Sequence, residues 1–389
     1  MKQDRHVITI TRLLEDLFEI VTVFHRGNRL EFGLINRYNR EKSITLITDR
    51  LQLAGYEFSL DSDSEQLLLS INPSPRLKIP PLNIILFVIT LFTVYFVPVF
   101  FGRLTAALLS LSENEELASQ LPLSGWQEFK LVMSLMPQVL DSTLEALANG
   151  AGIEFTLALI SILFVHEMGH FVASRRRNII TSWPYFIPAP NIIGTFGAVI
   201  KSKSPFWNRR DLIEVGAAGP IAGWVVAVGW LWYGLTQSTY LPLESFPLWE
   251  MGFSLDGESI LMRWLTAVLV GTAPDGSFYK LTEAAFAGWV GLLVTAINLL
   301  PIGQLDGGHI LYGLGQRRQH LLGFIAMAAL LVLGLESPIW WFFAAFGIIF
   351  GVKHPPTLND LKKPGGAATG LGIVALIILI ISFTPVPFQ

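Results

Sequence analysis

The 389-residue chain contains no cysteine, which excludes both disulfide bonds and thiolate metal ligands. Any zinc in this protein would therefore be held by histidine and carboxylate side chains. Charged residues are scarce as well: they make up 15% of the chain, against about 25% in an ordinary soluble domain. The net charge of −3 is too small to indicate that the partner is a nucleic acid or an acidic substrate.

Apolar residues take the place of the missing charges. They make up 52% of the chain, and the mean hydropathy is +0.52, which predicts an α-helical multi-span membrane protein. A short apolar stretch at Ile260–Val270 cannot span a bilayer and predicts an interfacial helix. Longer apolar stretches predict about seven transmembrane helices, at approximately residues 81–101, 153–173, 212–235, 284–300, 321–335, 339–352 and 367–383.

The first 78 residues predict a small soluble α+β domain, followed by a membrane domain at residues 79–389. Val7–Ile10, Ile20–Phe24 and Leu67–Ile71 have the composition of strands. Ile44–Ala54 has apolar residues at helical spacing. The first residues have neither an apolar signal core nor the composition of a transit peptide, so we expect membrane insertion to begin at the first internal span.

The second predicted span contains the sequence His166-Glu167-Met168-Gly169-His170. Helical residues four apart share a face, so His166 and His170 can bind one metal ion together. Glu167 lies beside them, where it can take a proton from a water molecule. This pattern also occurs by chance in soluble helices. Inside a membrane span, however, ionisable side chains are costly and indicate a functional site.

Two histidines leave a zinc ion short of a third protein ligand, and Asp306 is the best candidate. It follows the fourth predicted span, at the same basic-side depth as the histidine pair, and Pro301 and Gly303 would bend the chain before it. Two alternatives remain: Asp306 as a simple turn residue, and His309 as the ligand. Asn298, an amide at the end of an apolar span, would bind substrate or a developing oxyanion, or else a neighbouring helix.

The segment between the two motifs, residues 183–200, is interrupted by prolines and glycines. It predicts a re-entrant β-hairpin, which a membrane tolerates only against protein or a water-filled cavity. Gly194 and Gly197 permit a positive φ or a close backbone approach, which makes them candidate substrate-binding residues; the alternative is a tight turn.

Basic residues indicate a cytoplasmic or stromal side that also carries the N-terminal domain. They are Arg175, Arg176, Arg177, Lys201, Lys203, Arg209, Arg210, Arg317, Arg318, Lys353, Lys362 and Lys363.

With these motifs in this order, residues 150–315 resemble the site-2 protease family of intramembrane zinc metalloproteases. Gly194–Ala198 resembles the glycine-containing hairpin of that family, and Ala217–Gly223 resembles its Gly-Pro segment. The loop at 237–283 is too short for a PDZ domain, and the extra spans are similar to the cyanobacterial and plastid branch. The resemblance implies a Zn²⁺ cofactor on His166, His170 and Asp306, catalytic Glu167 and Asn298, and a hydrolase that cuts transmembrane segments of protein substrates.

Two other functions remain open: a catalytically silent membrane adaptor or chaperone, and a metal-ion transporter. A transporter predicts polar residues through several spans, whereas the last three spans contain almost none. A silent family member would not need Glu167. The expected partners are a transmembrane protein substrate and the lipid bilayer, with no nucleic acid. The expected location is a bacterial inner membrane, with a plastid or thylakoid membrane as the alternative.

Overall fold

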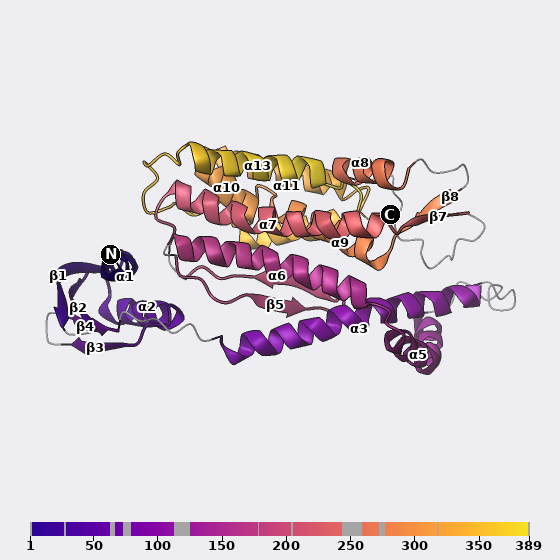
Figure 1. Ribbon diagram of the computed structural model, residues 1–389, viewed down its shortest axis with the longest axis horizontal. Helices are drawn as coiled ribbons and strands as arrows, with labels where there is room; N and C mark the ends of the chain where they lie inside the picture. Colours follow the sequence, from indigo (N-terminus) through magenta and orange to yellow (C-terminus); the bar gives the residue numbers. More distant parts are fainter. Residues whose placement is uncertain are drawn as a thin grey trace.

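The computed structural model describes residues 2–387 except for 27–28, 63–66, 73–78, 113–124, 178, 204, 243–258, 272–276 and 317. Arg317, one of the predicted basic residues, therefore lies outside the described residues. The chain is mostly helical (Figure 1). Among the described residues, three helices are long and apolar enough to cross a membrane. They are α3 (Pro81–Ser112), α6 (Ile153–Arg176) and α7 (Arg209–Leu235).

The other four predicted spans form shorter apolar helices. These are α9 (Glu283–Asn298), α11 (Arg318–Leu333), α12 (Ile339–Phe350) and α13 (Gly366–Ser382). The helix predicted at 260–270 is present as α8 (Ile260–Leu269), whose Met262 and Leu265 pack into the core at 1% exposure. One more helix and two strands are described in this part of the chain. They are α10 (Asp306–Gly315) and the strands β7 (Thr239–Pro242) and β8 (Ser277–Lys280).

Helix α5 (Gly125–Ala148) is not among the predicted helices, because polar residues and Pro137 interrupt its apolar pattern. It packs beside α3, and the Tyr95 hydroxyl donates a hydrogen bond to the Leu147 carbonyl at 2.9 Å. Strands β5 (Tyr185–Pro188) and β6 (Thr195–Val199) form the predicted hairpin, pairing antiparallel with Tyr185 opposite Val199. The hairpin lies between α6 and α3 (Figure 1).

The N-terminal residues form a unit with its own core, consisting of two helices and a four-stranded antiparallel sheet in the order β1-β2-β4-β3. The strand predicted at Val7–Ile10 is wrong: these residues belong to a helix, because Ile10, Leu13 and Leu14 share a helical face buried on the sheet. The other three predicted elements are confirmed. The elements are α1 (Lys2–Leu14), β1 (Phe18–Arg26), β2 (Arg29–Asn36), α2 (Arg40–Leu53), β3 (Phe58–Ser62) and β4 (Leu67–Ile71).

The order helix-strand-strand occurs twice in this unit, as α1-β1-β2 and then as α2-β3-β4. Buried Ile10 and Leu14 correspond to buried Ile47 and Leu51. The central strand pair has the register that such symmetry requires, since Leu30 lies opposite Ile71 and Leu34 lies opposite Leu67. The N-terminal unit is therefore two similar halves related by a pseudo-twofold axis between β2 and β4.

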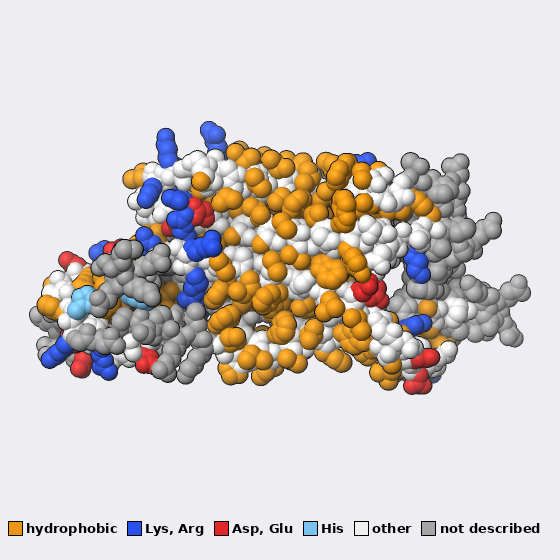
Figure 2. Space-filling model, viewed as in Figure 1, with side chains coloured by type: hydrophobic (Ala, Val, Ile, Leu, Met, Phe, Trp, Pro, Cys, Tyr) orange, Lys and Arg blue, Asp and Glu red, His pale blue; other side chains and the backbone are white. Residues whose placement is uncertain are grey.

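The N-terminal unit packs against the end of the helical core where α6 finishes. Ile180, three residues beyond Arg177, belongs to the hydrophobic core of the N-terminal unit and is 2% exposed. The Arg12 guanidinium donates to the Arg177 carbonyl at 3.4 Å and lies 5.7 Å from the Trp207 ring. Figure 2 shows Lys and Arg side chains gathered at this end, beside a broad hydrophobic surface over the helices. The N-terminal unit and the basic residues thus lie at the same end of the helical core.

Candidate metal centre

Three side chains from two distant parts of the chain meet at the basic end of the core. His166 and His170 extend from one face of α6, and Asp306 is the first residue of α10. The His166 Nε2 atom lies 3.2 Å from His170 Nε2, and Asp306 Oδ2 lies 3.4 Å from the first and 3.2 Å from the second. Among the described residues, these three form a group able to hold a metal ion.

The triangle of ligand atoms matches the geometry of zinc. Zinc bonds to histidine nitrogen and carboxylate oxygen are about 2.0 to 2.2 Å long, so tetrahedral neighbours lie about 3.3 Å apart. All three measured sides, from 3.2 to 3.4 Å, have this length. Three protein ligands leave the fourth tetrahedral position for water or substrate, as in catalytic zinc sites. The donor set therefore fits a zinc ion.

Glycines on α7 make room for the two imidazoles. A Cβ atom at Gly219 would overlap the His170 ring, and one at Gly223 would lie 2.9 Å from His166 Cβ. Helix α7 is equally close at Gly169, on the same face of α6 as the two histidines, because a Cβ there would overlap the Ala218 carbonyl. The Gly-Pro segment of α7, Ala217–Gly223, thus packs directly against the two histidines.

The backbone of α7 also sets the orientation of one ligand. His170 Nδ1 donates a hydrogen bond to the Val215 carbonyl at 2.8 Å. Because Nδ1 carries the hydrogen, the Nε2 lone pair of His170 is available on the side of Asp306. Metal-binding histidines commonly donate a hydrogen bond from the ring nitrogen that does not bind the metal, and this bond fixes both the tautomer and the ring orientation.

The bend that presents Asp306 follows the end of α9. That helix ends at Asn298, and Gly303 has a φ of +51°, a conformation that favours glycine. Asp306 then begins α10, and a Cβ at Gly307 would overlap the Leu299 carbonyl. The predicted bend at Pro301 and Gly303 is therefore present, and Asp306 both starts a helix and faces the histidines.

The remaining predicted site residues are placed as follows. Glu167 is buried beside His166, at 5% exposure, and Asn298 is half-buried at the end of α9. Gly194 has a φ of +77° in the hairpin turn, where a Cβ would overlap the Thr93 carbonyl of α3, and Gly197 has a φ of +94° in β6. His309 does not join the triangle; its Nδ1 lies 2.6 Å from His354 Nε2.

Sequence reasoning singled out the segment Ala217–Gly223 by resemblance but did not predict that its glycines pack against the histidines. Gly219 and Gly223 are spaced four apart on α7, the same spacing as the histidines on α6. That shared spacing is a signal for two helices in close contact, but the sequence does not say which helices are paired. The Val215 carbonyl has no sequence signal, since every residue carries one.

Fold and site together define a class: a mostly helical protein with membrane-length apolar helices and a buried group of three side chains able to hold a metal ion. Residues 154–335 match the family model described as peptidase family M50. The resemblance to intramembrane zinc metalloproteases, first indicated by the two motifs, is confirmed over this segment.

Plant proteins are similar over a longer part of the chain. "Probable zinc metalloprotease EGY2, chloroplastic" from Oryza sativa subsp. indica is 29% identical over 67% of this chain and 48% of its own length. "Probable zinc metalloprotease EGY1, chloroplastic" from Arabidopsis thaliana is 32% identical over 61% of this chain and 43% of its own length. The chain thus spans about half the length of the curated relatives it matches. No solved structure matches it.

Proposed function

We propose that this protein is an intramembrane zinc endopeptidase that cuts transmembrane segments of other membrane proteins. The observation that carries the proposal is the triangle of His166 Nε2, His170 Nε2 and Asp306 Oδ2, whose sides have the lengths expected for zinc ligands. The match to peptidase family M50 and the printed names of the plant relatives support the same activity.

The chemistry divides between the metal and the side chains. When bound, zinc supplies a Lewis acid that polarises a peptide carbonyl and acidifies a water molecule. Glu167 takes a proton from that water while the water oxygen forms a bond to the carbonyl carbon. The same proton then passes to the leaving nitrogen as the carbon–nitrogen bond breaks. Asn298, half-buried at the end of α9, is proposed to hydrogen-bond the substrate or the developing oxyanion.

Substrate would lie along the β5–β6 hairpin. A helical substrate must unwind before hydrolysis, and an extended segment can then add to the edge of a strand. The positive φ values of Gly194 and Gly197 give the hairpin its shape there, and the open space around Gly197 supports its assignment to substrate binding, whereas Gly194 packs against α3 and would act by shaping the turn. The finer topology belongs to the same proposal: about seven membrane-crossing helices, a re-entrant hairpin, and a soluble domain at residues 1–78 before the membrane domain at 79–389.

The basic end of the core is proposed to face the cytoplasm or stroma, since positive residues are retained on that side. The curated relatives are named as chloroplast proteins, so a plastid membrane is the proposed location. The bacterial inner membrane, which the sequence first favoured, finds no support among these relatives.

Two glutamates on α6 provide the test. Glu167 lies next to a metal-binding histidine, whereas Glu154 is at the opposite end of the same helix. In a detergent cleavage assay with single-span substrates, Glu167→Gln should lose activity by several orders of magnitude and keep its zinc, because the base is removed and the ligands remain. Glu154→Gln should retain both.

Other outcomes would assign a different function. Full cleavage by Glu167→Gln would remove Glu167 from the mechanism. Bound zinc without cleavage of any tested substrate by the wild type would favour an adaptor. Zinc flux into proteoliposomes that survives Glu167→Gln would favour a transporter.

A further inference from the structure

The loop that carries Asp306 is held by a later part of the chain, residues 351–360, which follows α12. The Gly303 amide donates to the Val352 carbonyl at 3.0 Å, at the bend before Asp306. A Cβ at Gly303 would overlap the Gly351 carbonyl, so the two backbones are in direct contact. The bend that aims Asp306 is therefore packed against the 351–360 segment.

Gln319 of α11 forms hydrogen bonds both to the loop before Asp306 and to the 351–360 segment. Its side-chain amide donates to the Pro301 and Val352 carbonyls, both at 3.0 Å, and its carbonyl accepts from the His354 amide at 3.1 Å. Gln319 is 1% exposed. A buried amide with three hydrogen bonds defines a single arrangement of its partners, because losing any one of them would leave a buried polar group unpaired.

A pair of imidazoles makes the next connection. His354 Nδ1 lies 2.5 Å from the Pro355 carbonyl, which can only accept, so Nδ1 carries the hydrogen. Its Nε2 then accepts from His309 Nδ1 at 2.6 Å. Burial lowers the pKa of His354 to about 4, so the ring is neutral at neutral pH and this direction is maintained. His309 is one helical turn after Asp306, and its Cβ packs near Gly216 of α7.

The far end of α10 is held by the same segment. The Tyr312 hydroxyl donates to Asp360 Oδ2 at 2.6 Å, and the Gln316 side chain donates to the Asp360 carbonyl at 2.7 Å. Burial alone would raise the pKa of Asp360, but hydrogen bonds from Thr357 and Tyr312 outweigh it and hold the pKa below its usual value. Asp360 is therefore an anionic acceptor, which strengthens these bonds.

We propose that the 351–360 segment positions Asp306 toward the two metal-binding histidines, with His354 and Gln319 as the positioning residues. The proposal rests on the proposed zinc site. It adds a part of the chain that lies beyond the family match, which ends at residue 335. It also gives two later helices a role: α11 carries Gln319, and α12 leads directly into residue 351.

The test uses full-length protein in detergent and cobalt as a visible substitute for zinc. His354→Ala should bind cobalt about 10-fold more weakly, the usual cost of losing an outer contact at a metal site. The absorption spectrum of its bound cobalt should also change, because a displaced Asp306 alters the coordination. His354→Gln should recover most of both properties, since an amide can accept from His309 and still donate. His320→Ala, directly after Gln319 in the first turn of α11 and in none of the hydrogen bonds above, is the matched control and should behave as the wild type.

The outcomes separate this proposal from the one on which it rests. Wild-type affinity and spectrum in His354→Ala would overturn the positioning role and leave the zinc site intact. A wild type that binds no cobalt or zinc would overturn the zinc site, and the positioning role with it. If His354→Ala does not give monodisperse protein, Tyr312→Phe decides the matter: about 3-fold weaker binding is expected for one lost hydrogen bond, and unchanged binding contradicts the proposal.

Discussion

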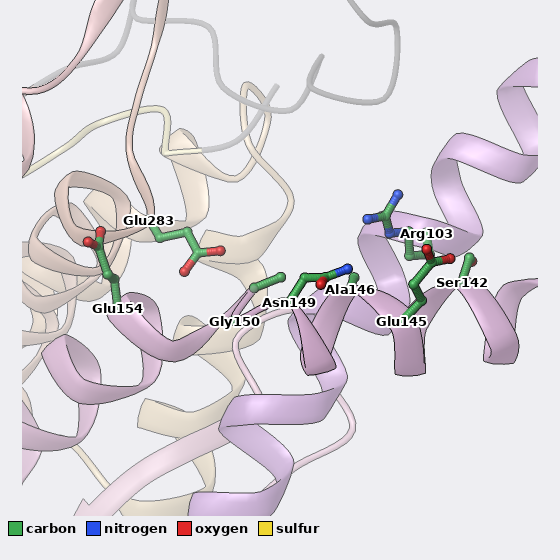
Figure 3. A pocket seen from close by; sticks show the side chains of 9 residues that line it. Arg103, Ser142, Glu145, Ala146, Asn149, Gly150, Glu154 and Glu283 are labelled. Carbon is green, nitrogen blue, oxygen red and sulfur yellow. The ribbon is translucent and has the colours of Figure 1, made fainter.

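The two ends of the helical core both carry acidic residues, but in opposite arrangements. At the basic end, Asp306 and two histidines bring their ligand atoms within 3.4 Å of one another. At the other end, carboxylates surround an open pocket of about 630 Å³ (Figure 3). Glu145, Glu154 and Glu283 line that pocket together with Arg103, and in Figure 3 they are spread along it.

The difference shows that the convergence of ligand atoms, and not the size of a cavity, marks the metal site. Among the described residues, the pocket acids do not form a group able to hold a metal, whereas His166, His170 and Asp306 do. Glu283 has a structural partner: its carboxylate accepts from the Gly152 amide at 2.8 Å, at the start of α6. One end of α6 is thus anchored, and the other carries the ligands.

The largest expected effect is from Asp306→Ala compared with Glu145→Ala. Removing a direct ligand should weaken zinc binding by more than the roughly 100-fold that an outer contact can cost, and should abolish cleavage. Removing a pocket carboxylate should change neither. Zinc content by mass spectrometry and the cleavage assay measure both. If His309→Ala lost all zinc and Asp306→Ala kept it, a three-histidine site would replace the proposed one.

Removal of the metal should have the next largest effect. A ligand that binds only the folded state at 100 times its Kd stabilises that state by about 2.7 kcal/mol. Treatment with a chelator should therefore lower the thermal unfolding temperature of the wild type, and added zinc should restore it. The same treatment should leave the unfolding temperature of Asp306→Ala unchanged. A chelator response that persists in that variant would place the metal elsewhere.

Gly219→Ala should have a smaller effect, at the basic end only. The new methyl group would overlap the His170 ring, so either α6 or the ring must move. We expect zinc affinity to fall by about 10-fold, as for other contacts that orient a ligand. Gly229→Ala, on the same helix with open space around the added Cβ, is the control. Equal zinc affinities in the two variants would contradict the close α6–α7 packing at the metal centre.

The smallest expected effect is from Glu283→Gln at the pocket end. The variant keeps a hydrogen-bond acceptor but loses the negative charge at the start of α6, which is worth about 0.5 kcal/mol at an exposed helix end. Thermal unfolding in detergent should show a slight decrease, and zinc affinity should be unchanged. A large loss of zinc would mean that the two ends of α6 are coupled and that the comparison between them fails.

Much of the metal centre could be read from the sequence because its ligands are grouped in short motifs. The spacing of His166 and His170 on one helix is local, and helical geometry alone places them on one face. Asp306 was identified because zinc needs a third ligand and cysteine is absent. The apolar composition likewise indicated a helical membrane protein, since apolar runs long enough to cross a bilayer are typical of transmembrane helices.

Other features depended on contacts that a sequence does not display. Val7–Ile10 has strand composition, yet it is helical because burial against the sheet outweighs the weak propensity of single residues. Helix α5 was missed for the same reason: its partner α3 supplies the packing that its interrupted pattern conceals.

The sequence by itself determined which side chains can bind the metal. Only the tertiary structure decided what holds them there. Gly219 packs against the His170 ring, the Val215 carbonyl accepts a hydrogen bond from His170 Nδ1, and the 351–360 segment packs against the bend before Asp306. The physical reason is that ligand identity is a matter of donor chemistry, which each residue carries alone. Ligand position depends on hydrogen bonds and close contacts between segments more than 40 residues apart, which form only when the chain folds.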